Sequence, residues 1–300
     1  MAFAGTTSHP SPGLLAIALA VLAAVGWGAS DYFGGDATRH DTPVFVVVAA
    51  AELLGVALLV PALVIRGTPP PLDPRLLLAA LAGLAVTVEL GLIYRALSQG
   101  QAFITAPTGA LGTAAAVLVG LIAGDPLGLA VAIGLLCAVL GGAVSAWNPS
   151  TRGTRRDGTL HSAVICVAAA AALATMLTAF HAAGRLDPYW ATATEHASTC
   201  ISAGILGLLG VRGRLRQLVP RRPQLPMLAL VATVGVGGDL AYAGASRLGA
   251  LSIVSGISSL YPVTTIGLGR VLQNLRATRL QVAGTILALS GAVLLGASTH

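Results

Sequence analysis

Residues 249–296 read GALSIVSGISSLYPVTTIGLGRVLQNLRATRLQVAGTILALSGAVLLG, two apolar stretches joined by a short basic turn. Residues 100–147 follow the same plan: GQAFITAPTGALGTAAAVLVGLIAGDPLGLAVAIGLLCAVLGGAVSAW. An alignment of the two stretches superposes Gly100 on Gly249, the turn at residues 124–126 on the turn around Asn274, and Gly141 on Gly291. The offset is about half of the chain length. The pattern therefore predicts a duplicated domain.

The composition places that domain in a membrane. Hydrophobic residues make up 55% of the chain, charged residues make up 9%, and the mean hydropathy is +0.84. A soluble domain carries roughly 25% charged residues. A chain of 300 residues with so few charges cannot cover a surface that faces water. The composition thus indicates an integral membrane protein and excludes a soluble one.

The basic residues do not indicate a nucleic-acid partner. The formal charge of +6 comes from 17 arginines, and the chain has no lysine. A basic patch can bind nucleic acid, but these arginines lie in short gaps between apolar stretches, where they act as topology signals. Cys137, Cys166 and Cys200 lie inside apolar stretches without a CxxC spacing. We expect them to be small apolar residues with no metal or redox role.

A membrane-spanning helix needs about 20 mostly apolar residues. Ten stretches meet this requirement: 13–34, 43–65, 75–97, 102–123, 127–147, 160–182, 188–210, 225–247, 250–272 and 279–298. No lysine or arginine precedes the first stretch, so we expect it to be retained as a helix and not cleaved as a signal peptide. We predict an all-α integral membrane protein made of two five-helix repeats, residues 1–148 and 160–300, with a polar linker at 149–159.

The odd number of spans per repeat has a consequence for topology. The second repeat must enter the membrane from the opposite side, so the two repeats are inverted. Inverted repeats are typical of secondary transporters, in which the substrate site lies near the midplane between the halves. Four arginines fall on the side of the termini: Arg66, Arg75, Arg185 and Arg247. The other thirteen fall on the opposite side, so the arginine distribution alone predicts that both termini are outside the cell.

Charged side chains inside a bilayer cost roughly 2.5–3.5 kcal/mol each on insertion scales, so they are the candidates for function. Five carboxylates fall within spans: Asp31, Glu52, Glu89, Glu195 and Asp239. Glu89 and Asp239 occupy equivalent depths in the third and eighth spans to within one residue. The first hypothesis is a pair of substrate- or proton-binding acids in a central cavity. The alternative is a neutral, protonated acid held by hydrogen bonds between helices.

The other candidates are polar or aromatic neighbours of these acids. Tyr242 follows Asp239 on one helix face, and Trp27 shares a face with Asp31. Glu195 precedes His196, a pair that suits either a proton relay or a structural contact. For Glu52 we expect a packing role or a hydrogen bond between helices. Pro262, next to Tyr261, either opens backbone carbonyls toward a cavity or is a tolerated kink.

No enzyme signature stands out. The sequence has no HExxH, GxSxG or DDxxD motif, and without lysine it has no ATP-binding Walker A loop. Residues 236–239 read VGGD and differ from the GxGD of intramembrane aspartyl proteases at the first position, and the partner YD motif is missing. We therefore expect neither an enzyme nor a bound cofactor.

Three motifs resemble a known family. They are WGASDYFGG at residues 27–35, YRAL at 94–97 and SSLYPV at 258–263. They are similar to elements of EamA-type members of the drug/metabolite transporter superfamily, and the resemblance covers all ten spans. It implies a two-repeat membrane transporter. It does not identify the substrate.

The chain departs from this family at one turn. The family usually carries Gly-Glu before the last helix of each repeat, whereas this chain has Gly124-Asp125 in the first repeat and Gln273-Asn274 in the second. The family is also usually drawn with both termini in the cytoplasm, the reverse of the arginine distribution. A reporter fusion in the loop at residues 212–222 distinguishes the two orientations.

We expect a secondary transporter in the cytoplasmic (inner) membrane that moves a small metabolite or drug by alternating access. Proton coupling through Glu89 or Asp239 is the mechanistic hypothesis, because a carboxylate that binds and releases a proton in each cycle can bias two states. The expected partners are the lipid bilayer, a small-molecule substrate and H⁺. The sequence gives no oligomeric state. The alternative is a membrane protein that binds a lipid or protein partner on the same scaffold without transport.

Overall fold

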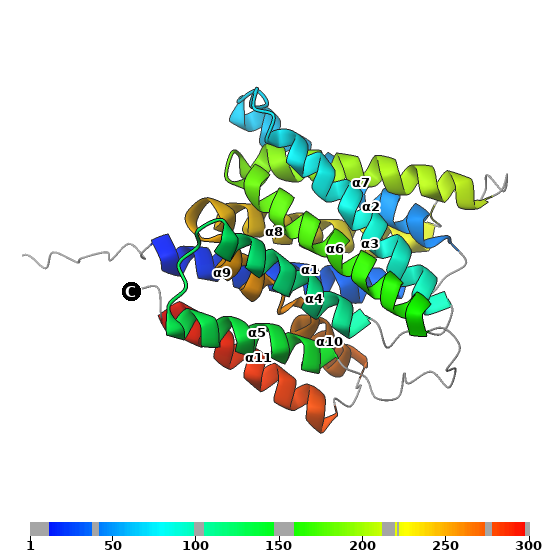
Figure 1. Ribbon diagram of the computed structural model, residues 1–300. Helices are drawn as coiled ribbons and strands as arrows, with labels where there is room; N and C mark the ends of the chain where they lie inside the picture. Colours follow the sequence, from blue (N-terminus) through cyan, green and yellow to red (C-terminus); the bar gives the residue numbers. More distant parts are fainter. Residues whose placement is uncertain are drawn as a thin grey trace, which may run out of the picture.

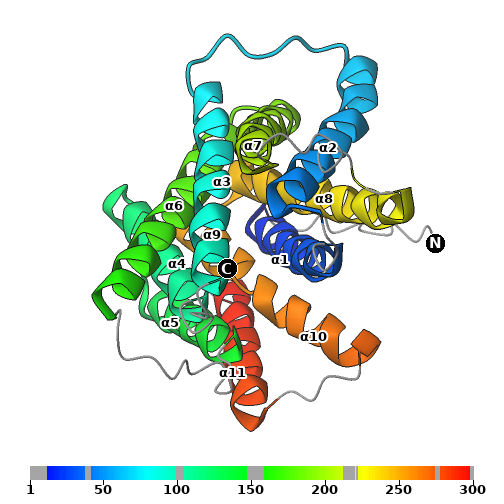
Figure 2. The same cartoon turned by 90° about the vertical axis from the view of Figure 1, so that its right-hand side faces the viewer.

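The structure is a computed structural model that describes residues 12–37, 42–98, 105–146, 159–211, 220, 222–273 and 278–297. These residues form a bundle of α-helices with one short 3₁₀ turn at Arg222–Gln224 and no strand (Figures 1 and 2). The helices of the first half are α1 (Pro12–Ala37), α2 (Val44–Arg66), α3 (Leu76–Ser98), α4 (Thr105–Ile122) and α5 (Leu129–Ala146). Those of the second half are α6 (Thr159–Gly184), α7 (Pro188–Val211), α8 (Leu225–Leu248), α9 (Leu251–Ser258), α10 (Tyr261–Gln273) and α11 (Arg279–Ala297).

The predicted span at 250–272 differs from expectation because it consists of two helices, α9 and α10, separated at Ser259–Leu260. The amides of Leu260 and Val263 bond the carbonyls three residues earlier, at 3.0 and 2.9 Å, which closes tight turns at the break. Pro262 is the second residue of α10, where a missing N–H costs little. The proline therefore lies at the start of a new helix and does not kink a continuous one.

Among the described residues, six helical segments are long and apolar enough to cross a membrane, the α9–α10 pair being counted as one: Gly13–Gly35, Val44–Arg66, Leu76–Ile93, Ala163–Gly184, Arg222–Leu248 and Leu251–Leu272. Three shorter apolar helices lie at Thr108–Ile122, Leu129–Val144 and Arg279–Leu295. Helix α7 is in neither group, and its first half carries several Thr and Ser residues together with Glu195 and His196. These helices establish a membrane protein, and the number of ten spans stays a prediction.

The helices of the two halves pack in a reciprocal pattern. Helix α1 packs against α8, and α3 packs against α6. Helix α2 packs against α7, and α5 lies along α11 at one side of the bundle (Figures 1 and 2). If α1 corresponds to α6 and α3 to α8, an exchange of the halves maps the α1–α8 contact onto the α6–α3 contact. A two-fold relation between the halves predicts this pattern.

Small residues allow the closest of these contacts. A Cβ atom added to Gly26 of α1 would lie 2.7 Å from the Cα atom of Gly238 in α8. A Cβ atom added to Gly291 of α11 would lie 2.6 Å from the carbonyl oxygen of Gly134 in α5. Lipid tails are as apolar as leucine side chains, so helices in a membrane associate through such close van der Waals packing.

An ion pair joins α2 to the start of α7. Both guanidinium nitrogens of Arg66 donate to the Asp187 carboxylate, at 3.0 and 2.8 Å. Asp187 Oδ1 also accepts the backbone N–H groups of Tyr189 and Trp190, at 2.9 and 3.0 Å, and so caps α7. Partial burial opposes ionisation of this carboxyl, but these hydrogen bonds outweigh it and lower the pKa of Asp187.

Candidate functional site

A cavity of about 360 Å³ lies between helices of the two halves. Helices α1, α4 and α5 of the first half form one part of its wall, and α10 and α11 of the second half form the other. Its polar lining includes Asp31, Thr113, Ser259, Tyr261, Thr265 and Gln281. Pro262 also lines the cavity, so the break between α9 and α10 is part of its wall. The volume is within the range of small-molecule sites.

Two acids and a tyrosine gather at this cavity. Asp31 extends from α1 into the lining, and Tyr261 begins α10. Glu89 of α3 interacts electrostatically with both residues. The cavity therefore has one carboxyl group in its wall and a second one that acts on it electrostatically, so an organic cation or a proton can interact with this pair.

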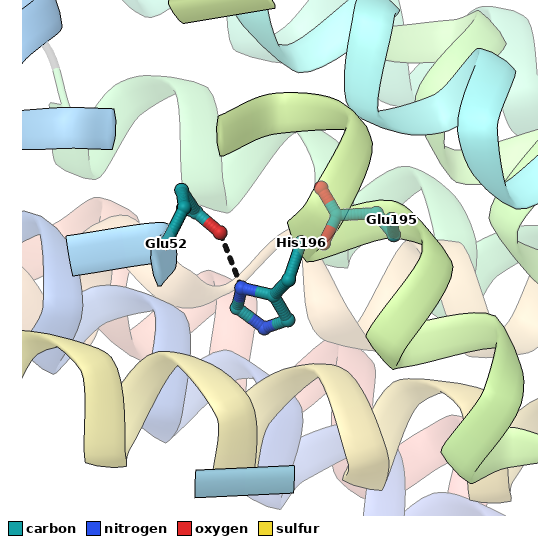
Figure 3. A group of neighbouring side chains, drawn as sticks. All are labelled: Glu52, Glu195 and His196. Carbon is teal, nitrogen blue, oxygen red and sulfur yellow. Dashed lines mark hydrogen bonds and ion pairs between the residues drawn. The ribbon is translucent and has the colours of Figure 1, made fainter. Parts of the chain in front are cut away.

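A second polar group lies between α1, α2, α7 and α8. The Trp27 indole Nε1 donates a hydrogen bond of 2.7 Å to Asp239 Oδ1. The Asp239 Oδ2 atom lies 3.1 Å from His196 Nε2, an ion-pair distance. The other ring nitrogen of His196, Nδ1, is bonded to the carboxylate of Glu52 (Figure 3). His196 thus joins one acid from each half of the chain.

Glu195 lies next to this group and is 6% exposed. Its Oε1 atom accepts a hydrogen bond of 2.8 Å from the Thr199 hydroxyl, one helical turn further along α7. One ligand atom from each of Glu52, Glu195 and His196 lies within 4.8 Å of the other two. These three residues can hold a metal ion.

Tyr242 is a core residue in this structure. Its side chain is fully buried, and its hydroxyl is bonded to the Leu177 carbonyl oxygen at 2.8 Å and to Ser255 Oγ at 3.0 Å. Its ring lies 5.1 Å from the Trp27 ring and 5.7 Å from the Phe180 ring. The Tyr242 ring thus packs against the Trp27 ring, and Tyr242 is not among the residues that line the cavity.

The structure thus separates the residues that the sequence singled out. Asp31, Tyr261 and Pro262 line the cavity, and Glu89 interacts electrostatically with two of them. Trp27 and Asp239 belong to the second polar group, and Glu195 lies next to it. The Tyr242 ring packs against the Trp27 ring. Glu89 and Asp239, which the repeat alignment predicts to be equivalent to within one residue, have different neighbours.

Sequence reasoning gave Glu52 no role in a site. The hydrogen bond between helices expected for Glu52 is present, and its partner is His196, 144 residues away. The sequence did show an acid and a histidine within apolar spans. It could not show that Glu52 and His196 meet, because periodicity along one helix does not reveal which residue of another helix lies opposite.

Helix α1 connects the two groups. Trp27 and Asp31 are one turn apart, and the residue after Trp27 is Gly28, whose carbonyl oxygen accepts a hydrogen bond of 3.0 Å from Thr265 of α10. A Cβ atom added to Gly28 would lie 2.5 Å from the Thr264 Cβ atom. Helix α1 therefore contacts α8 at Trp27 and the cavity wall just beyond it.

Comparisons with known proteins agree with this architecture. The EamA-like transporter family model matches residues 14–147 and, again, residues 160–297. One crystal structure superposes with a TM-score of 0.71 at 18% sequence identity, covering 93% of this chain and 95% of the other. At that identity the likeness shows the fold alone. No curated protein matches the sequence.

The two family matches cover nearly the whole chain and coincide with the two halves of the bundle. They confirm the two-repeat architecture and the resemblance to EamA-type members of the drug/metabolite transporter superfamily. The chain belongs to the EamA-like transporter family.

Proposed function

We propose that this protein is a secondary transporter that moves a small organic solute across the cytoplasmic membrane by alternating access. The observation that carries the proposal is the cavity between the halves, lined by Asp31 and Tyr261. Secondary transporters with inverted repeats bind their substrates near the midplane at the interface between repeats.

The proposed topology has ten spans arranged as two inverted repeats. The α9–α10 pair counts as one span, because together it covers Leu251–Leu272. The reciprocal packing of α1 on α8 and α3 on α6 supports the inverted arrangement. In alternating access the two halves rock against each other around a site that stays between them.

The break between α9 and α10 supports a substrate role for this region. Discontinuous helices are frequent at transporter sites, where non-helical backbone is tolerated if it lines a cavity. Ser259, Tyr261 and Pro262 at the break all line the cavity. Rotation of α10 about this break would change the cavity wall without disturbing α9, which is buried along its whole length.

The acids favour a cationic or zwitterionic solute. Asp31 and Glu89 interact with each other and with Tyr261, and no arginine lines the cavity among the described residues. A positively charged group on the solute would relieve the repulsion between the two carboxylates. The apolar part of the solute would contact residues such as Val139 and Ile266 in the same wall.

Glu89 is the proposed proton-coupling residue. Its carboxyl group interacts electrostatically with Asp31 of the cavity wall, so binding of a proton and binding of a cationic solute would compete for the same negative charge. Asp239 is the less suitable of the two acids considered, because its oxygen atoms contact Trp27 and His196.

The test is pH-driven uptake in proteoliposomes, with solutes chosen by a metabolite-export screen of cells that overexpress the protein. We expect Glu89→Gln to abolish uptake driven by a pH gradient while solute counterflow without a gradient remains. Asp31→Asn should weaken solute binding. Asp73→Asn is the matched control, because Asp73 lies in the α2–α3 loop, bonded to Arg75. Gradient-driven uptake by Glu89→Gln at the parental rate would refute the coupling, and no flux of any solute would refute transport.

A further inference from the structure

The group formed by Glu52, Glu195 and His196 has no part in the proposed transport cycle. It lies between α2 of the first repeat and α7 of the second (Figure 3). Glu195 and His196 are 6% and 3% exposed. Their position makes them a separate site, away from the cavity lined by Asp31 and Tyr261.

The spacing of the three side chains suits a single ion. Their ligand atoms, two carboxylate oxygens and one imidazole nitrogen, all lie within 4.8 Å of one another. Zinc binds imidazole nitrogen and carboxylate oxygen at about 2.0–2.2 Å in tetrahedral geometry, so ligand atoms on one ion lie roughly 3.3–3.6 Å apart. Small rotations of the side chains would bring all three onto one ion.

The surroundings of the three residues resemble the outer shell of a metal site. A histidine that binds a metal usually directs its other ring nitrogen to a carboxylate, which fixes the ring. His196 presents Nδ1 to Glu52 and Nε2 to Asp239, whose Oδ2 atom is 3.1 Å away. That contact is not aligned as a hydrogen bond, and Nε2 has no other partner among the residues that the structure describes. Trp27 in turn holds Asp239 in place by its indole hydrogen bond.

Glu195 has a similar supporting contact. The Thr199 hydroxyl is 2.8 Å from Glu195 Oε1 and 3.2 Å from the carbonyl oxygen of Gly83 in α3. A Cβ atom added to Gly83 would lie 2.8 Å from the Thr199 Oγ1 atom, so α3 closely confines that hydroxyl. The contact fixes the rotamer of Glu195 before any ion binds.

The carboxyl groups in this region outnumber the basic groups that pair with them. Three carboxylates surround one imidazole, and the ion pairs formed by Glu52 and Asp239 within the described part of the chain are with His196 alone. If all three carboxyl groups ionise, even a positively charged His196 leaves an excess of negative charge between these helices. Buried charges in proteins are paired or bind metals, and a divalent cation would supply the missing charge.

We propose that Glu52, Glu195 and His196 bind one divalent transition-metal ion of the zinc class, with Asp239 orienting His196. Nitrogen and oxygen ligands together favour such ions over Mg²⁺ and Ca²⁺, which prefer oxygen alone. Three protein ligands leave a coordination position open for water. The ion would link α2 to α7 and hence the first repeat to the second.

The proposal is tested by metal binding to the full, tag-free chain in lipid nanodiscs after dialysis against a chelator. Titration with Co²⁺, followed by its visible absorption, should reach one equivalent, and Zn²⁺ should displace it. Glu52→Gln and Glu195→Gln should each weaken binding at least 100-fold. Asp239→Asn, which changes only the orienting contact, should weaken it about 10- to 100-fold.

Glu89→Gln and His181→Gln are the matched controls, because they remove a membrane carboxyl group and a buried imidazole outside the group. Both should bind Co²⁺ like the parent. X-ray absorption at the zinc edge of the parent protein needs no variant. It should show one nitrogen ligand with oxygen ligands at about 2.0–2.2 Å.

The absence of one tightly bound equivalent in the parent, or equal binding by Glu195→Gln, would overturn the site. A spectrum with several imidazole ligands would do the same, because it would place the ion on other histidines. None of these readouts depends on transport, so failure of the site and failure of the proposed function are distinguishable.

Discussion

The contact between α1 and α8 at Gly26 offers a sharp test of how this bundle is held together. In Gly26→Ala the new methyl group would lie 2.7 Å from the Gly238 Cα atom and 2.8 Å from both the Gly238 nitrogen and the Val234 carbonyl oxygen. All three are backbone atoms, so no side chain can rotate away and the helices must separate. Overpacking of this kind costs about 1–3 kcal/mol.

Gly237→Ala is the matched control on α8, because a Cβ atom added there meets nothing within 4 Å. At that position alanine should stabilise the helix by about 0.5–1 kcal/mol relative to glycine. The assay is thermal unfolding in detergent, together with near-ultraviolet circular dichroism, to which Trp27 contributes; its hydrogen bond to Asp239 spans the same contact. Equal stabilities for Gly26→Ala and Gly237→Ala would refute the close packing of α1 on α8.

Two further predictions concern stability. The pKa of Asp187 is lowered in the folded protein, so the stability that its carboxylate contributes is complete above the unfolded-state pKa of about 3.9 and is lost as the pH falls through the folded value. Asp187→Asn should therefore flatten the acid limb of a plot of melting temperature against pH. An unchanged limb would contradict the ion pair with Arg66. Tyr242→Phe should cost about 1–3 kcal/mol in unfolding free energy, because the buried Leu177 carbonyl loses its tyrosine donor; a parental melting temperature would argue against that hydrogen bond.

Much of the fold could be predicted from the sequence, because continuous apolar stretches of the right length leave few alternatives. The ends of the helices agree with the predicted spans to within three residues, apart from the break in the ninth. Hydropathy is continuous across Ser259 and Leu260, so it could not show that break. The proline next to it predicted a disturbance, but whether the helix bends or ends depends on the hydrogen bonds of the turn.

The site was less predictable, because a shared helix face does not identify the neighbouring helix. Tyr242 and Asp239 are three residues apart on α8, yet Asp239 meets Trp27 and His196, whereas the tyrosine hydroxyl reaches α6 and α9. The repeat placed Glu89 and Asp239 at equivalent depths. It could not reveal that their surroundings had diverged, because those surroundings come from residues far away in the sequence.

The claim that the cavity between the repeats is the path of the solute is tested most directly by cysteine labelling in sealed vesicles. The three cysteines of the chain are first replaced by alanine. In that background Ala143→Cys places a thiol in the cavity wall. Leu140→Cys, on the same helix, places a thiol on the outward face, where Leu140 is 54% exposed. We predict that a membrane-impermeant maleimide labels the cysteine at 143 and that a transported solute slows this labelling, whereas the cysteine at 140 stays unreactive in lipid. A cysteine at 143 that resists the reagent from both sides of the membrane would contradict a water-accessible cavity.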